Sequence, residues 1–184
     1  ACTVLDVMAR EDLVARAAQH GQALLSGLQQ ALAGHPRVRE GVILHGPNLW
    51  PSIPGFRDTV LAYIDALEDL GHALMRGCAL GLGLPADYFE QHGTRDPLLL
   101  LRFFNYPARA IPADVPAQWG VGEHTDYGVL TLLKQDDAGG LQVKSRQHGW
   151  VEAPPLAGSF VCNIGDMLDR MTRGVYRSTP HRVV

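Results

Sequence analysis

The chain has 184 residues, of which 46% are hydrophobic and 19% are charged, and its formal net charge is −3. This composition can bury a core and excludes a disordered polyelectrolyte. The nearly balanced charge gives no reason to expect nucleic acid or an anionic membrane as a partner. No apolar run approaches the roughly 20 residues that span a bilayer, so we expect no membrane segment.

The three cysteines indicate the redox environment. Cys2, Cys78 and Cys162 lie far apart in the sequence and form no CxxC pair. This pattern predicts neither a disulfide framework nor a structural zinc site and favours a reducing cytoplasm. The chain begins at Ala1 without a signal-peptide pattern, which we interpret as a fragment boundary or a processed start.

The first half of the chain has helical periodicity. Apolar residues recur at helical spacing over residues 10–33 and again over 56–82, and Gly and Pro follow both segments. Residues 41–55 are rich in Gly and Pro and predict a loop. A short helix is expected over 86–91.

The second half predicts short strands. We expect strands over 98–104, 128–135 and 159–164, a hairpin from 141–144 and 150–153, a short helix over 166–171, and an extended segment over 175–184. Several short strands separated by turn signals favour an all-β barrel or jelly roll. The predicted fold class is therefore α+β, with a jelly roll that follows α-helices.

Three residues carry the main chemical signal. His124 and Asp126 are separated by one residue, and on an extended segment both side chains project to the same face. His181 would come from a different strand. Two imidazoles and one carboxylate on one face of an octahedron leave three positions open, for O2 and a bidentate co-substrate. This geometry indicates non-haem Fe(II).

The residues around this triad carry a specific resemblance. His124 begins the run HTDYGVLTLL, which continues into QD and GGLQV; later come NIGD at 163–166 and YRSTPHRV at 176–183. From about residue 45 to 184 the sequence resembles the isopenicillin-N-synthase-like branch of the Fe(II)/2-oxoglutarate-dependent dioxygenases.

The resemblance implies a fold, a reaction and a set of roles. The fold would be a double-stranded β-helix, and His124, Asp126 and His181 would bind Fe(II). Tyr106 would help to hold 2-oxoglutarate. O2 and 2-oxoglutarate would be consumed, succinate and CO2 released, and a C–H bond of a small organic substrate oxidised. An Arg-x-Ser strand normally follows the second His of this family, but the chain ends at Val184, so we expect an incomplete barrel.

The first residues resemble a different family. Residues 1–41 are similar to a helix in the C-terminal domain of class III PLP-dependent aminotransferases. This segment contains no lysine for a Schiff base, so it could not transaminate alone. We therefore predict a junction, with an aminotransferase-like segment over 1–41 and a partial dioxygenase domain over 42–184.

Two alternatives remain open from the sequence. One is an iron oxidase that does not use 2-oxoglutarate, as in isopenicillin N synthase itself. The other is an inactive, truncated or chimeric metal-binding fragment. The sequence indicates neither the primary substrate nor the oligomeric state.

Overall fold

The computed structural model describes residues 15–21, 40–43, 48–104, 106 and 120–184. It divides into two compact units, Ala1–Asn105 and Tyr106–Val184, each of which is described by itself. The predicted junction near residue 41 is not tested by this division and stays a prediction. Most of residues 1–41, predicted to be an aminotransferase-like segment, lies outside the described residues, so that prediction is not tested.

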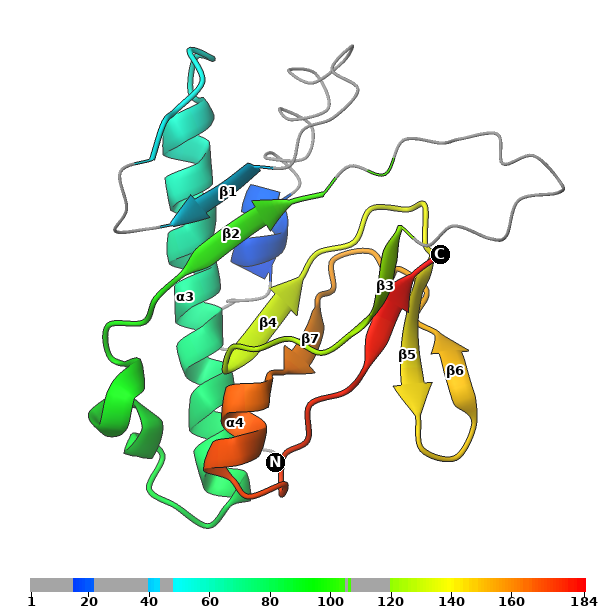
Figure 1. Cartoon of the computed structure of the whole chain (residues 1–184). Coiled ribbons are helices and arrows are strands. Elements are labelled where there is room, and N and C mark those ends of the chain that lie inside the picture. Colours follow the sequence, from blue (N-terminus) through cyan, green and yellow to red (C-terminus); the bar gives the residue numbers. More distant parts are fainter. Residues whose placement is uncertain (1–14, 22–39, 44–47, 105, 107–119) are drawn as a thin grey trace, which may run out of the picture. The chain divides into compact units, whose positions relative to one another are not determined.

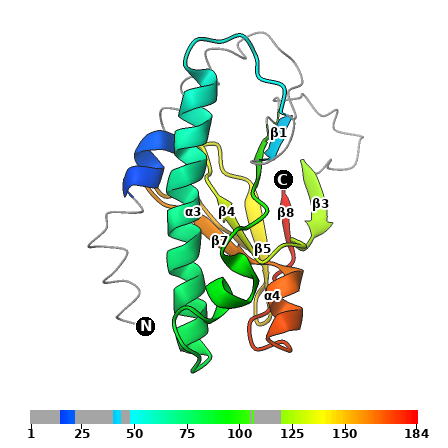
Figure 2. The same cartoon turned by 90° about the vertical axis from the view of Figure 1, so that its left-hand side faces the viewer.

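The first unit is built around one long helix, α3, Phe56–Gly81. Val60, Tyr63 and Ile64 of this helix are buried, as expected for an apolar stripe at helical spacing. Residues 15–21 form a shorter helix beside α3 (Figure 2). Arg16 Nη2 lies 3.5 Å from Asp69 Oδ2 of α3, which makes an ion pair between the two helices. The helix predicted over 56–82 is confirmed. Of the helix predicted over 10–33, only residues 15–21 are described, and they are helical.

Two details of the first unit correct the sequence prediction. Residues 41–43 were expected in a loop, but they belong to strand β1, Glu40–Ile43, which pairs antiparallel with β2, Leu100–Phe103. Pairing with a distant strand stabilises this short β-branched segment despite the glycines and prolines that follow it. The short helix expected over 86–91 is confirmed in part: residues 88–89 are helical and continue into a π-helix, η1, Glu90–Thr94, which extends beyond the predicted end.

The second unit contains two antiparallel sheets (Figure 1). One has the strand order β3-β8-β5-β6, formed by Val121–His124, His181–Val183, Leu141–Ser145 and Gly149–Glu152. The other pairs β4, Leu130–Leu133, with β7, Val161–Ile164. Helix α4, Asp166–Met171, follows β7 directly. The strands of the described residues do not close into a barrel.

Most predictions for the second unit are confirmed. The hairpin is β5–β6, strand β7 lies within 159–164, and α4 has the predicted bounds. The extended segment over 175–184 is a strand only at β8. Before β8, the chain is held by side chains of α4 and the residue after it: Asp169 accepts a hydrogen bond from the Ser178 N–H (2.8 Å), and the Thr172 hydroxyl accepts one from the Tyr176 N–H (3.1 Å).

None of the helices that the structure describes combines the length and the apolar character needed to cross a membrane.

Burial of Tyr63 predicts a loss of stability at alkaline pH. Only 4% of Tyr63 is exposed, and burial raises its pKa from 10.0 to about 12. Because the folded pKa lies above the unfolded one, the contribution of the neutral Tyr63 to the free energy of unfolding is fully present below pH 10. It falls by up to about 3 kcal/mol as pH rises to about 12. Urea unfolding at several pH values should show a shallower alkaline loss in Tyr63→Phe. The control is Tyr127→Phe at an exposed tyrosine, which should keep the wild-type dependence of the free energy of unfolding on pH. If Tyr63→Phe also kept the wild-type dependence, the prediction would be contradicted.

Candidate metal centre

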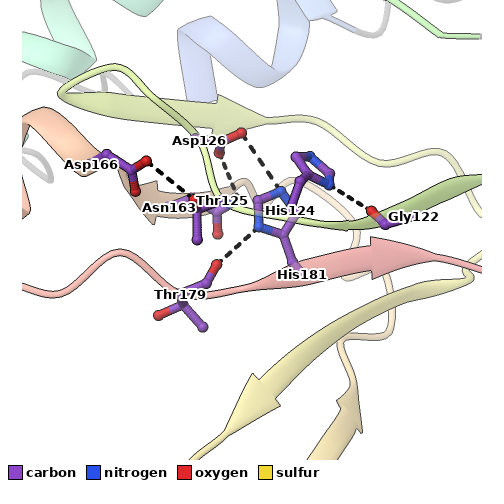
Figure 3. A network of polar contacts seen from close by, with 8 residues as sticks. All are labelled: Gly122, His124, Thr125, Asp126, Asn163, Asp166, Thr179 and His181. Atoms are coloured by element: carbon purple, nitrogen blue, oxygen red, sulfur yellow. Dashed lines mark hydrogen bonds and ion pairs between the residues drawn. The ribbon is translucent and has the colours of Figure 1, made fainter.

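Two histidines meet across a pair of strands. His124 is the last residue of β3 and His181 is the first residue of β8, and the antiparallel register places them directly opposite each other. Their ring centroids are 4.3 Å apart. Figure 3 shows both rings on the same side of the two strands, next to Asp126. Strand pairing alone therefore brings together two imidazoles that are distant in sequence.

Asp126 completes the group from a neighbouring loop. The nitrogen or oxygen atoms that the three side chains can offer all lie within 4.8 Å of one another, and Asp126 Oδ1 is 3.7 Å from His181 Nε2. The sequence argument placed His124 and Asp126 on one extended segment, but β3 ends at His124 and Asp126 lies in the loop that follows. The two side chains still converge.

Each imidazole is oriented by a carbonyl two residues before it. His124 Nδ1 lies 2.9 Å from the Gly122 carbonyl oxygen, and His181 Nδ1 lies 3.0 Å from the Thr179 carbonyl oxygen (Figure 3). A carbonyl oxygen can only accept, so Nδ1 donates in both rings, and in the neutral form of each ring Nε2 carries the lone pair. This arrangement is typical of metal-binding histidines, in which the second ring nitrogen fixes the tautomer.

Asp126 is held by β7 and by the start of α4. Asn163 of β7 donates from Nδ2 to Asp126 Oδ2 at 3.3 Å, and the Asp166 N–H donates to the Asp126 carbonyl at 2.7 Å. The Thr125 hydroxyl donates to Asp166 Oδ2 at 3.2 Å. The side chain of Asp126 is therefore anchored to β7 of the other sheet, and its main chain to the first residue of α4.

Gly165 makes this anchoring possible through a close backbone approach. An added Cβ at Gly165 would lie 2.0 Å from the Gly128 carbonyl oxygen, a separation that no side chain can adopt. The Gly165 N–H donates to the Val129 carbonyl at 3.0 Å. Only glycine lets the loop after Asp126 and the turn after β7 pass this closely.

The donor set fits a divalent transition metal. Two neutral imidazole nitrogens and one carboxylate oxygen suit iron in particular, because they leave positions on the metal for other ligands. His181 is 6% exposed and the Asp126 side chain 20%, whereas His124 is exposed. Within the described ranges, these residues form the one group of at least three His, Cys, Asp or Glu side chains close enough to share an ion.

Tyr106, the predicted co-substrate residue, lies beside β8. A Cβ added at Gly120 would be 3.0 Å from Tyr106 Cδ1 and 3.3 Å from Val183 Cγ1. Val183 and His181 are two residues apart on β8, so they share one face of the sheet. The tyrosine ring, which is 43% exposed, thus lies against Gly120, whose N–H donates to the Val183 carbonyl of β8 at 2.9 Å.

Comparison with known proteins identifies the family. The model of the 2OG-Fe(II) oxygenase superfamily matches residues 95–184. A probable iron/ascorbate oxidoreductase of Dictyostelium discoideum is 54% identical over 169 residues, covering 81% of this chain and 46% of that protein. Residues 95–184 belong to the 2OG-Fe(II) oxygenase superfamily. A second relative, a homoarginine-6-hydroxylase of Oryza sativa, is 46% identical over 142 residues. The match covers 76% of this chain and 43% of that protein.

Solved structures confirm the jelly-roll fold of this superfamily member. A full-length Neurospora crassa protein in complex with alpha-KG and 5-formyluracil aligns with a TM-score of 0.69 and 37% identity over 79% of this chain and 50% of that one. The C-terminally truncated, apo form of the same Neurospora protein aligns with a TM-score of 0.67 and 32% identity. This match covers 95% of this chain and 71% of that one. The chain spans about half the length of the curated relatives it matches.

Sequence reasoning missed the residues that support the site. Asn163, Gly165 and Asp166 entered only as part of the family-like NIGD run at 163–166. Asp166 begins α4, and its backbone N–H and its carboxylate both contact the Thr125–Asp126 segment. The available signal was the NIGD run itself, because a glycine at the end of a predicted strand, two residues after a polar side chain, can mark a close backbone approach.

Proposed function

We propose that the protein is a non-haem Fe(II)- and 2-oxoglutarate-dependent oxygenase that oxidises a small organic molecule, with His124, Asp126 and His181 as the iron ligands. The observation that carries this proposal is the convergence of the three donors with both Nδ1 atoms already occupied by carbonyl oxygens. Each Nε2 is then the atom left to bind a metal. Superfamily membership supports iron as that metal.

The charge of the donor set favours an anionic co-substrate. Two neutral imidazoles and one carboxylate compensate one of the two positive charges of Fe(II), so the centre retains positive charge that attracts an anion. Iron bound here supplies activation of O2 coupled to oxidative decarboxylation of 2-oxoglutarate to succinate and CO2. The protein residues hold the ligand tautomers and orient the carboxylate.

We propose Tyr106 as a contact for 2-oxoglutarate. Its ring lies against Gly120, whose N–H donates to the carbonyl of Val183, and Val183 shares a face of β8 with His181. An anionic co-substrate bound beside His181 could therefore accept a hydrogen bond from the phenol.

The relatives favour use of 2-oxoglutarate over the oxidase alternative. The full-length Neurospora structures carry alpha-KG, and several relatives are named homoarginine-6-hydroxylases. From this likeness we propose a small-molecule substrate for this protein. We further propose that the oxygenase part begins near residue 42, that it belongs to the isopenicillin-N-synthase-like branch, and that it works in a reducing cytoplasm, where Cys78 and Cys162 would stay as thiols.

The proposal predicts that the protein converts 2-oxoglutarate to succinate in an Fe(II)-dependent reaction. Purified protein incubated with Fe(II), ascorbate, O2, 2-oxoglutarate and a panel of small amino acids and pyrimidines should release succinate, measured by mass spectrometry, together with O2 consumption. Chelation of the metal should stop both. Substrate oxidation that continues when 2-oxoglutarate is omitted would contradict the proposal and support the oxidase alternative.

A further inference from the structure

We propose that Asn163 is a positioning residue that holds the Asp126 carboxylate so that Oδ1 alone faces the metal position. The inference rests on the proposed function, because it assigns a role within the same metal centre. It concerns how the carboxylate is presented rather than which residues bind.

The two carboxylate oxygens of Asp126 have different neighbours. Oδ2 accepts the hydrogen bond from Asn163 Nδ2 at 3.3 Å, whereas Oδ1 lies 3.7 Å from His181 Nε2 (Figure 3). Nε2 is the atom of His181 that is left for a metal, so Oδ1 is the oxygen on the metal side. The amide of Asn163 occupies the other oxygen and fixes the rotation of the carboxylate.

Asn163 is a buried polar residue whose side chain reaches Asp126. It is 8% exposed and lies in the middle of β7, opposite Thr131 of β4. A buried amide costs free energy unless its polar atoms are hydrogen-bonded, so the contact with Asp126 offsets that cost. The next residue but one, Gly165, brings the chain close enough for the Asp166 N–H to bind the Asp126 carbonyl as well.

Asp126 is the ligand whose orientation depends on a distant segment. His124 and His181 are oriented by the carbonyls of Gly122 and Thr179, each two residues away on the same stretch of chain. The Asp126 side chain is held by β7, which belongs to the other sheet. Loss of the Asn163 amide should therefore release the carboxylate while both imidazoles keep their tautomers.

The consequence of this contact is a single-oxygen ligand. A carboxylate that can rotate freely can bind a metal through both oxygens, and it would then occupy a position that a co-substrate needs. With Oδ2 bound to Asn163, the carboxylate is available through Oδ1, and the remaining positions stay open. Asn163 thereby affects both metal affinity and the number of open positions.

The test measures Co(II) affinity of the full chain by isothermal titration calorimetry. Asn163→Leu, which keeps a similar size but has no donor, should weaken Co(II) binding about 10–100-fold, as is typical for loss of an outer-shell partner. Asn163→Ala should do the same without added bulk. The matched control is Cys162→Ala, because Cys162 is the neighbouring exposed residue of β7 and alternation points it away from the site.

A double-mutant cycle separates positioning from a general structural role. If Asn163 acts through the carboxylate, then adding Asn163→Leu to Asp126→Ala should change Co(II) affinity less than about 2-fold, because the contact is already gone. If Asn163→Leu weakened Co(II) binding equally in the wild-type and the Asp126→Ala proteins, the inference would be overturned. Wild-type Co(II) affinity in both Asn163→Leu and Asn163→Ala would overturn it as well. A wild-type chain that binds no Co(II) would overturn the proposed function as well, so the two failures are distinguishable.

Discussion

Replacing His181 with alanine is expected to lower Fe(II) affinity more than about 100-fold and succinate formation to below about 1% of wild type, beyond the effect of losing an outer-shell partner. His181 is 6% exposed and sits opposite His124 in the strand register. Among the described residues, no other His, Cys, Asp or Glu side chain lies close enough to His124 and Asp126 to replace His181 as a metal ligand. A metal bound by only one imidazole and one carboxylate exchanges readily with solvent. Metal titration and succinate release by the same protein preparation measure both effects.

The control for this substitution is another histidine of the same unit. His148 lies exposed in the turn between β5 and β6, so His148→Ala should retain wild-type metal affinity and turnover. Circular dichroism of the metal-free variants checks that both remain folded. Wild-type turnover in a folded His181→Ala protein would refute the assignment of this residue as an iron ligand.

The sequence predicted the elements that depend on local signals. Helix α4 has the predicted bounds because a glycine precedes it and apolar residues follow at helical spacing, and the β5–β6 hairpin follows from two short β-rich runs around a turn. The candidate ligands His124, Asp126 and His181 were also identified, because a His-x-Asp pair stands within one family-like run and His181 within another. Each run is short, although the two runs are distant from each other in the sequence.

The parts that were missed depend on pairing between distant segments. Strand β1 is recognisable only through its partner β2, because its own residues are followed by a run typical of loops. The contact of Asn163 with Asp126 arises where a residue of β7 meets the loop after β3. Register is set by the tertiary arrangement, and a shift of one residue would reverse which face Asn163 occupies. No local pattern specifies such a contact.

Gly165→Ala is expected to cause the largest loss of stability among the substitutions considered for the second unit. The new Cβ would lie 2.0 Å from the Gly128 carbonyl oxygen and 2.5 Å from its carbonyl carbon, and both are backbone atoms that cannot rotate away. The two segments must separate, at a cost of about 3 kcal/mol or more. Separation also breaks the hydrogen bond from Asp166 to the Asp126 carbonyl, so metal affinity should fall with stability.

Gly128→Ala provides a control at the same contact. A Cβ added at Gly128 meets no atom within 4 Å. The free energy of unfolding of this variant should therefore lie within about 1 kcal/mol of the wild-type value. Urea unfolding monitored by circular dichroism gives both free energies, and Co(II) titration of the folded fraction gives the affinity. If Gly165→Ala matched Gly128→Ala in stability and metal affinity, the close approach of the two segments would have no part in holding Asp126. The anchoring of the carboxylate would then rest on the Asn163 side chain alone.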